Sequence, residues 1–281
     1  MKLKALILFG IFSLTVVLAG CSNAGNPSTT TSAANSDTSI STTAAASEDL
    51  LGQIKKAGVI RIGQEGTYAP FTFHDSTGKL TGFDYDIAEA VAAKLGVKTE
   101  YIETKWDGIF AGLDAKRFDI IVNEVGINAE RQEKYDFSDP YILSKAVLIV
   151  SSDNAAITKF EDLKDKKSAQ SLTSNFGKLA QSYGAELVQV DGFNQSIDLI
   201  TSKRADATIN DSLSFLDFLK QKPDAKIKVV AESDQADKSG IMLRKGNKEL
   251  LDAINKALAD ISADGTYLKI SQKWFGEDVS K

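Results

Sequence analysis

The sequence predicts an α/β protein built from two lobes. Over residues 59–122, short apolar runs alternate with stretches of helical periodicity in the order β-α-β-α-β, which favours a mostly parallel sheet. After Tyr141 the same alternation restarts. The alternation extends over the 234 residues from Glu48 to Lys281. Their number, together with the second start of the pattern, indicates two lobes rather than one.

Apolar spacing and capping residues place the elements of the first half. Apolar residues recur at helical spacing over 87–95, and Gly96 directly after them is a typical C-cap. Asp107 is expected to cap the next helix, because its carboxylate can accept from the free backbone N–H groups of a first turn. Strands are predicted at 59–62, 98–102 and 119–122.

The second half repeats the alternation with shorter segments. A closing helix is predicted from Leu250 to Ile261, where apolar residues share one face, and Gly265 follows it. Other helical segments are predicted at 160–163, 179–183, 197–200 and 213–219. Strands are predicted at 146–150, 168–172, 187–190, 207–210, 226–230 and 241–244.

Residues 1–20 are expected to be a signal peptide rather than part of the fold. Lys2 and Lys4 precede an apolar run over 5–18, which is too short to cross a bilayer comfortably. Small residues then close the run in the order Leu-Ala-Gly-Cys. This ending resembles a bacterial lipoprotein signal, in which Cys21 would become the lipidated first residue. An ordinary secretory peptide with an incidental cysteine is the alternative.

Residues 21–47 are predicted to form a flexible tether behind the lipidated Cys21. After that cysteine the segment consists almost entirely of Ser, Thr, Ala, Asn and Gly, with one charge, Asp37. It contains too little apolar surface to fold. Such a tether has an r.m.s. reach of roughly 28 Å, so the folded part, which should begin near Glu48, would lie clear of a membrane.

The charge balance excludes polyanionic partners. With 43% hydrophobic and 25% charged residues, the composition is that of a globular protein. The formal net charge of −5 becomes −7 once Lys2 and Lys4 leave with a signal peptide. Nucleic acid and anionic membrane surfaces are therefore poor partners.

An arginine in an unfavourable helical position marks the candidate site. Asn128 is a plausible N-cap, which puts Glu130 and Arg131 in a first helical turn, where the helix dipole suits the acid but not the arginine. An anionic ligand beside Arg131 would explain its position, since its guanidinium and free backbone N–H groups could grip a carboxylate together. Pairing of Arg131 with a neighbouring Glu or Asp is the alternative.

The sequence has no conventional catalytic or metal-binding motif. It contains one histidine, no Gly-x-Ser-x-Gly, no phosphate-cradling glycine loop, and no cysteine besides Cys21. We therefore expect no catalytic residue, no metal site and no cofactor. His74 falls at a predicted turn, where a surface or structural role is expected.

Polar and aromatic residues follow the predicted strands at positions where open α/β sheets bind ligands. Glu65 and Tyr68 come directly after the first strand, and Trp106 precedes the second predicted helix in an equivalent loop. Asp211 lies at a strand-to-helix junction of the second half. Taken singly, each is also explained by packing or, for Asp211, by N-capping.

Motifs spread from Glu48 to Lys281 occur in an order typical of one family. They are Glu65 to Phe71, Gly82-Phe83-Asp84, Arg117-Phe118-Asp119, Arg131, Phe137-Ser138-Asp139-Pro140-Tyr141 and Trp274-Phe275-Gly276. Together they resemble the extracellular solute-binding proteins of polar amino-acid ABC importers. Within that family, residues 123–125, 167–175 and 210–213 are most similar to the cystine-binding branch.

The resemblance implies a periplasmic-binding-protein-like fold of type II, with a ligand cleft between two lobes. Two crossing segments, near 142–144 and 238–240, would join them. Lobe 1 would comprise residues 48–143 and 239–281, and lobe 2 would comprise residues 144–238.

The resemblance also implies how an amino acid would be held. Arg131 would bind the α-carboxylate and Asp211 the α-ammonium, while Tyr68 and Trp106 would enclose the side chain beside Glu65. A zwitterion enclosed away from water must meet opposite charge at both ends, so this pair of charges suits it.

Further residues would complete the pocket. The backbone near Gly126, Asn128 and Thr173 would help Arg131, and Glu124 and Ser174 would add polar capacity for a ligand with two zwitterionic ends. There are two departures from the family pattern. Gly126 stands where many relatives have a hydroxyl residue, and Glu124 where cystine-type proteins usually have Gln.

The resemblance implies that the protein would capture an extracellular amino acid, L-cystine above all, and would deliver it to ABC permease and ATPase subunits. It would be a monomer on the outer face of the bacterial cytoplasmic membrane, held only through lipid at Cys21. Another polar amino acid, or an adhesin or sensor role, is the alternative. An enzyme on this fold would need Glu65, Glu124 or His74 as general acid or base.

Overall fold

The computed structural model describes residues 49–281. The predicted signal peptide, Cys21 and the predicted tether lie outside the described residues. No helix within 49–281 combines the length and the apolar character that a membrane crossing needs.

Lobe 1 is built on a mixed five-stranded sheet in the order β5-β1-β6-β15-β7. Its strands are β1 (Val59–Gln64), β5 (Lys98–Glu103), β6 (Ile120–Ile121), β7 (Tyr135–Phe137) and β15 (Met242–Arg244). Strand β1 runs parallel to β5 and β6, whereas β15 is antiparallel to β6 and β7. Because β6 and β7 are both antiparallel to β15, the strands β1, β5, β6 and β7 all run in one direction, which confirms the mostly parallel sheet. The exception is β15, which returns late in the chain from lobe 2.

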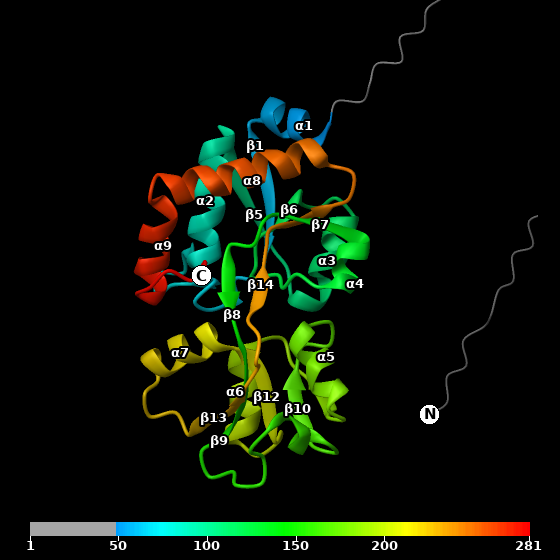
Figure 1. The fold of residues 1–281 in the computed structure, drawn as a ribbon, viewed down its shortest axis with the longest axis vertical. Helices are drawn as coiled ribbons and strands as arrows, with labels where there is room; N and C mark the ends of the chain where they lie inside the picture. Colours follow the sequence, from blue (N-terminus) through cyan, green and yellow to red (C-terminus); the bar gives the residue numbers. More distant parts are fainter. Residues whose placement is uncertain (1–48) are drawn as a thin grey trace, which may run out of the picture. The chain divides into compact units, whose positions relative to one another are not determined.

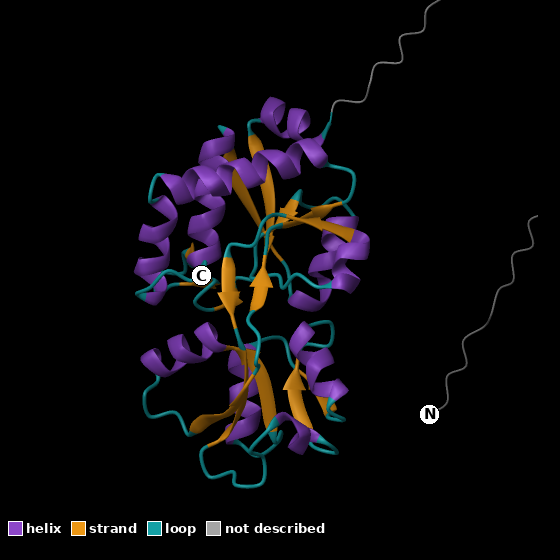
Figure 2. Ribbon diagram, viewed as in Figure 1, coloured by secondary structure: helices purple, strands orange, loops and turns teal. Residues whose placement is uncertain are grey.

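Helices cover both faces of this sheet (Figures 1 and 2). One core packs helices α1 (Leu50–Ala57), α2 (Phe83–Leu95), α8 (Lys248–Ala263) and α9 (Thr266–Phe275) against β1. A second core joins α3 (Trp106–Asp114) to β6 and β15, next to α4 (Ala129–Lys134). A small antiparallel sheet of β2 (Thr67–Tyr68), β3 (Thr72–His74) and β4 (Leu80–Thr81) follows β1.

Lobe 2 is a second five-stranded mixed sheet, ordered β11-β10-β12-β9-β13. Strands β10 and β11 are parallel, while β9 is antiparallel to β12 and β13. The strands are β9 (Ala146–Ser151), β10 (Lys167–Gln170), β11 (Glu186–Gln189), β12 (Ala207–Asp211) and β13 (Ile227–Glu232). The helices are η1 (Phe160–Leu163), α5 (Asn175–Ser182), α6 (Phe193–Thr201) and α7 (Ser212–Gln221).

Two antiparallel segments link the lobes, β8 (Ile142–Ser144) and β14 (Asp237–Ser239). They run side by side through the waist of the molecule in Figure 1. The C-terminal tail supports β8, because the Leu143 N–H donates to the Val279 carbonyl at 2.8 Å. The predicted fold class, two α/β lobes joined by two crossing segments, is confirmed.

Three local predictions need correction. The helix expected after Asp107 begins one residue before it, and no side chain caps it. The strand expected over 168–172 ends at Gln170, because Ser171 begins the polar turn that leads to α5. The C-terminal helix α9 was not predicted, since only Asp264, the C-cap of α8, and Gly265, the N-cap of α9, separate the two helices.

Candidate functional site

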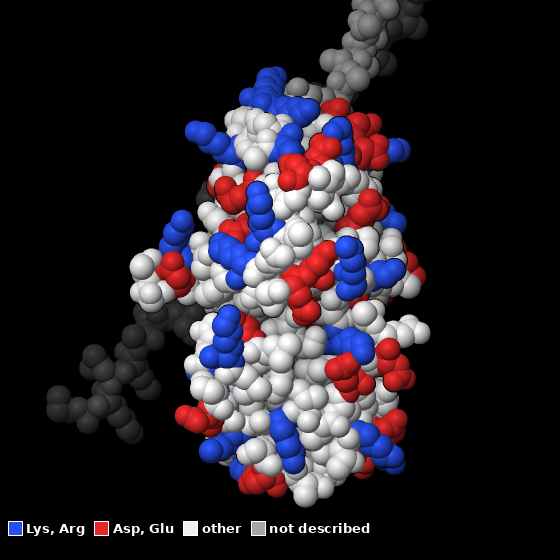
Figure 3. Space-filling model, turned by 60° about the vertical axis from the view of Figure 1, so that its left-hand side comes forward, with Lys and Arg blue, Asp and Glu red and all other residues white. Residues whose placement is uncertain are grey.

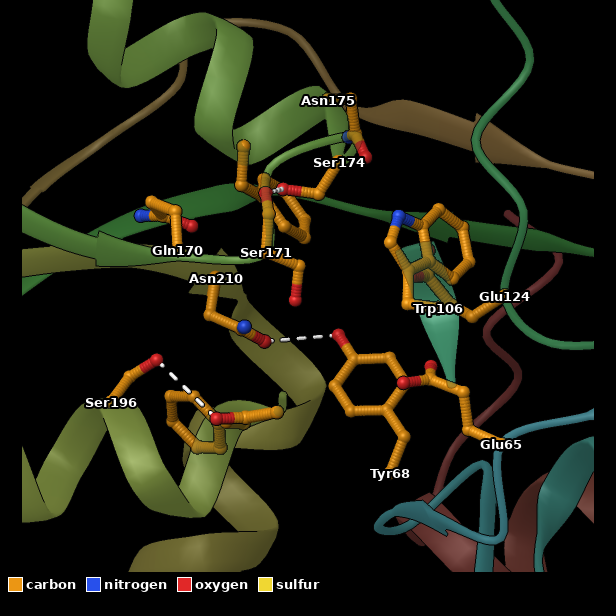
Figure 4. A pocket seen from close by; sticks show the side chains of 13 residues that line it. Glu65, Tyr68, Trp106, Glu124, Gln170, Ser171, Ser174, Asn175, Ser196 and Asn210 are labelled. Atoms are coloured by element: carbon orange, nitrogen blue, oxygen red, sulfur yellow. Dashed lines mark hydrogen bonds between the residues drawn. The ribbon is translucent and has the colours of Figure 1, made fainter. Parts of the chain in front are cut away.

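A polar pocket lies between the two lobes (Figure 4). The empty space within it is about 480 Å³, which includes space open to solvent. Lobe 1 contributes Glu65, Tyr68, Trp106 and Glu124. Lobe 2 contributes Gln170, Ser171, Ser174, Asn175, Phe176, Gly192, Phe193, Ser196 and Asn210.

Hydrogen bonds across the cleft hold the lobes together. The Tyr68 hydroxyl donates to Asn210 Oδ1 at 2.9 Å, as Figure 4 shows, and the Ser214 hydroxyl donates to the Ala69 carbonyl at 3.1 Å. An ion pair of Lys105 with Asp191, 2.7 Å long, also links the lobes. The structure therefore shows a closed cleft.

Arg131 is buried behind the pocket without an acidic partner. Asn128 Oδ1 accepts from the Arg131 backbone N–H at 2.9 Å, which confirms Asn128 as the N-cap of α4. The guanidinium donates to the Gly126 carbonyl at 2.8 Å and lies over the rings of Trp106 and Phe110, 5.3 and 5.2 Å from their centroids. Within residues 49–281 no carboxylate lies within ion-pair distance of it.

This arrangement removes the alternative of an arginine paired with a neighbouring acid. Burial lowers the pKa of Arg131, and the nearby Glu124 charge partly opposes that effect. The guanidinium stays charged, since arginine titrates far above neutral pH. A buried cation whose only described acceptor is one carbonyl is suited to receive an anion.

Glu65 is a pocket acid with an unusual protonation equilibrium. Asn123 Nδ2 donates to its carboxylate at 2.8 Å, and its own backbone N–H donates back to Asn123 Oδ1 at 2.8 Å. Burial outweighs the hydrogen bond from Asn123 and raises the pKa of Glu65 to about 7. Near neutral pH this group can therefore take either form and respond to a cation in the pocket.

Serines of the two crossing segments hold two further buried acids. Ser239 of β14 donates to Glu124 Oε1 at 2.6 Å, and Ser144 of β8 donates to Asp211 Oδ2. Burial, and then the charge of Asp211, raise the pKa of Glu124 well above its ordinary value. Burial likewise raises the pKa of Asp211. Movement of the crossing segments therefore acts directly on these two carboxyl groups.

Asp211 lies in the wall behind the pocket rather than in its lining. It N-caps α7, accepting from the Leu213 N–H at 2.8 Å and the Ser214 N–H at 3.4 Å. Its charge still raises the pKa of Glu124 and of Tyr68, both of which line the pocket. Capping alone does not need so deeply buried an acid, since exposed caps satisfy the same N–H groups.

The structure brings only some predicted residues to the pocket surface. Glu65, Tyr68, Trp106, Glu124 and Ser174 line it; Arg131, Gly126, Asn128, Thr173 and Asp211 do not. Ser174 N-caps α5, with its hydroxyl accepting from the Gly177 N–H at 2.9 Å. The Thr173 N–H donates to Asp107 at 3.0 Å instead of facing the pocket. His74 contacts Glu103 and the Gly66 carbonyl, outside the pocket.

Several lining residues were not named in advance. Phe176, Gly192, Phe193 and Ser196 come from the starts of α5 and α6, where no local motif distinguishes a lining residue from a core residue. Gln170, Ser171 and Asn175 belong to segment 167–175, and Asn210 belongs to segment 210–213, both of which were related to the cystine-binding branch. One general rule would have found these lining residues. In open α/β sheets, ligands bind at the carboxyl ends of the strands, where the following helices begin.

Charged side chains on the outside are mixed in sign. Figure 3 shows lysines, arginines, aspartates and glutamates interspersed over both lobes on the face it draws. Basic groups pair with acids either within a lobe, as Lys145 does with Glu232, or across the cleft, as Lys178 of α5 does with Glu130 of α4.

Comparisons with known proteins agree with this geometry. Residues 60–277 match the family described as bacterial extracellular solute-binding proteins, family 3. The chain is 48% identical over 234 residues to the L-cystine-binding protein TcyA of Bacillus subtilis, covering 83% of this chain and 87% of that protein.

Two solved structures bear on the state of the cleft. The unliganded open L-cystine solute receptor of Neisseria gonorrhoeae is 49% identical and covers 79% of this chain and 95% of its own, with a TM-score of 0.54. An ancestral arginine-binding protein bound to glutamine is only 41% identical and covers 78% and 99%, yet its TM-score is 0.75. The higher score for the liganded protein fits a closed cleft.

The family match covers most of the chain and agrees with the two-lobed fold. It also confirms the prediction of a binding protein rather than an enzyme. The chain belongs to the bacterial extracellular solute-binding proteins, family 3.

Proposed function

We propose that this protein captures an amino acid, L-cystine above all, in the interlobe pocket and delivers it to an ABC importer. The observation that carries the proposal is Arg131, a buried cation beside the pocket with no carboxylate partner among the described residues. Three buried carboxyl groups, those of Glu65, Glu124 and Asp211, lie in the same region and can take up the positive end of a ligand. A zwitterion satisfies both groups at once.

Each end of the ligand has a chemically suitable partner. Arg131 takes the α-carboxylate through its planar fork, supported by the start of α5 at Ser174. Asp211 takes the α-ammonium, and the nearby Glu124 carboxyl can accept a further hydrogen bond from it. Gly126, Asn128 and Thr173 shape the turns around these groups. Because Arg131 belongs to lobe 1 and Asp211 to lobe 2, both are used fully only when the cleft is closed.

Cystine suits this pocket better than an amino acid with a single polar end. Its second zwitterion needs further polar partners, which Glu65 and the Ser171, Ser174 and Asn175 side chains supply. The folded part has no cysteine that could exchange with the ligand's disulfide. Two similar proteins, from Bacillus subtilis and Neisseria gonorrhoeae, carry cystine in their names.

The same proposal places the protein at the membrane surface. The Leu-Ala-Gly-Cys ending supports lipidation of Cys21, and residues 21–47 would tether lobe 1 (48–143 and 239–281) and lobe 2 (144–238) near a permease. Cys21→Ser should move the protein from the membrane fraction to the medium. Membrane retention at the parental level would refute the lipid anchor.

Ligand-driven closure tests the proposed function. Small-angle scattering of the tag-free domain should show a smaller radius of gyration with cystine than without ligand, because the lobes approach each other. Mass spectrometry should recover the cystine unchanged after incubation. A radius that no amino acid changes would contradict capture by lobe closure, and a converted ligand would indicate an enzyme.

A further inference from the structure

The indole N–H of Trp106 is a buried donor without an acceptor. Trp106 is 8% exposed and lines the pocket. Among buried side-chain polar atoms of residues 49–281, only Asp84 Oδ2, Thr104 Oγ1 and Trp106 Nε1 lack a hydrogen-bond partner. Of these three residues, only Trp106 lines the pocket. A buried donor costs free energy unless something in the functional state accepts from it.

The surroundings of Trp106 fix the direction of this donor. The Arg131 guanidinium lies over the indole at 5.3 Å, and the Phe110 ring meets it edge-on, with centroids 5.3 Å apart at 85°. The ring is therefore held by its neighbours on lobe 1. Figure 4 shows the indole nitrogen on the side that faces Ser174 and Asn175, at the start of α5.

Hydrogen-bond donors gather on that side of the pocket. A Cβ built on Gly126 would lie 3.5 Å from both Arg131 Nη1 and Asn175 Nδ2, so the guanidinium of lobe 1 and the amide donor of lobe 2 both border Gly126. The start of α5 adds the positive end of a helix dipole. Indole N–H, guanidinium and amide are all donors, so a group that offers several acceptor lone pairs and a negative charge, such as a carboxylate, suits them best.

We infer that the indole N–H of Trp106 donates a hydrogen bond to a carboxylate oxygen of the bound amino acid. This inference rests on the proposed function and gives Trp106 a second role besides enclosing the ligand side chain. It makes Trp106 a ligand-binding residue, because a ligand without an acceptor at this place leaves the donor buried and unpaired.

An NMR experiment observes this donor directly. The chain has two tryptophans, and Trp274 Nε1 already donates to Asp86 at 2.7 Å, outside the pocket. In a Trp274→Phe variant labelled with ¹⁵N-tryptophan, the remaining indole signal belongs to Trp106. Cystine should move its proton downfield, as formation of a charge-assisted hydrogen bond requires. An unmoved proton under saturating cystine would overturn the inference.

Affinity gives the second arm of the test. Replacing the Trp106 indole by the isosteric 3-benzothienyl group exchanges N–H for sulfur and keeps the ring that covers Arg131. Cystine should then bind about 10- to 100-fold more weakly, whereas the same exchange at Trp274 should leave affinity unchanged. Trp106→Phe also lacks the donor and should show at least the same loss.

S-Methylcysteine, which has one carboxylate, distinguishes the two carboxylates of cystine. If the benzothienyl exchange weakens both ligands, the donor contacts the α-carboxylate held by Arg131. If it weakens cystine alone, the donor contacts the second carboxylate. Unchanged affinity for both ligands refutes the inference and leaves the proposed function standing, whereas parental protein that binds no amino acid refutes the function itself.

Discussion

Thr173 of lobe 2 donates both its backbone N–H and its hydroxyl to one carboxylate oxygen of Asp107 in lobe 1, at 3.0 and 2.8 Å. The other Asp107 oxygen accepts from Leu172 N and Gln189 Nε2 at 3.4 and 3.3 Å. All these donors belong to lobe 2. Because opening would separate them from Asp107, the contacts stabilise the closed state without touching the pocket lining.

Asp107→Ala should therefore weaken cystine binding about tenfold, which corresponds to roughly 1.4 kcal/mol. The reason is loss of closed-state stability, so dissociation should accelerate and the preference among ligands should stay unchanged. Stopped-flow kinetics measures both. Lys105→Ala is the matched control, since the Lys105–Asp191 pair is exposed and crosses the same gap. Equal effects of the two variants would reduce Asp107 to an ordinary surface contact.

Arg131→Ala should weaken cystine binding by about 2–5 kcal/mol, since the ligand carboxylate would be left buried without its cation. Arg131→Lys should restore only part of the affinity, because an ammonium lacks the planar fork and stacks poorly on Trp106. Calorimetry measures the loss, and circular dichroism checks folding. The exposed Arg204→Ala provides a charge-matched control. Parental affinity in a folded Arg131→Ala protein would remove the proposed carboxylate site.

Asp211→Asn separates charge from capping. Asparagine caps helices about as well as aspartate, so α7 should stay intact while the ligand ammonium loses its counter-charge. Cystine binding should weaken markedly, and added salt should not reproduce the loss in the parent, since the pair is buried. Titrations at two salt concentrations check both expectations. An affinity within twofold of the parent would leave Asp211 as a helix cap only.

The raised pKa of Glu65, about 7, makes binding depend on pH. The unliganded folded protein keeps the proton in a window where the unfolded chain, with a pKa of about 4.3, has lost it. A ligand ammonium favours the ionised form, so binding should release protons near pH 6. Affinity should then rise with pH from 5 to 7, by at most about tenfold per pH unit for each proton released.

The same linkage has the opposite sign for stability. Between pH 4.3 and 7 the folded unliganded domain binds more protons than the unfolded chain, so its unfolding free energy should fall as pH rises through this window. Calorimetry in two buffers with different ionisation enthalpies counts the protons released on binding. Glu65→Gln should reduce that count. If binding releases no protons at pH 6, Glu65 does not meet the ligand's cation.

The sequence predicted those features that depend on interactions between residues close together in the chain. Asn128 caps α4, Gly96 ends α2 with a φ of 76°, and the apolar face of Leu250 to Ile261 lies buried in α8. Each depends on hydrogen bonds or packing set by short spacing. Arg131 was identified for a related reason, because a cation in a first helical turn needs a compensating partner.

Long-range contacts could not be predicted from spacing. Asp107 looked like a helix cap, but its carboxylate meets donors 65, 66 and 82 residues away in lobe 2. Ser144 and Ser239 lie in the expected crossing segments, but nothing in the sequence indicated that they donate to Asp211 and Glu124. Such contacts form only when distant segments of the chain come together, so the sequence of any one segment does not predict them.

Calorimetric titration of the tag-free mature domain with cystine, glutamine, histidine and arginine tests the central claim most directly. A pocket with a buried Arg131 at one end and several acids and amides elsewhere should hold two zwitterionic groups better than one. We predict that cystine binds most tightly of the four, and that reductant abolishes the response while the protein stays folded. Tighter binding of glutamine, histidine or arginine would contradict the cystine assignment, and binding of none of the four would contradict the account of the site.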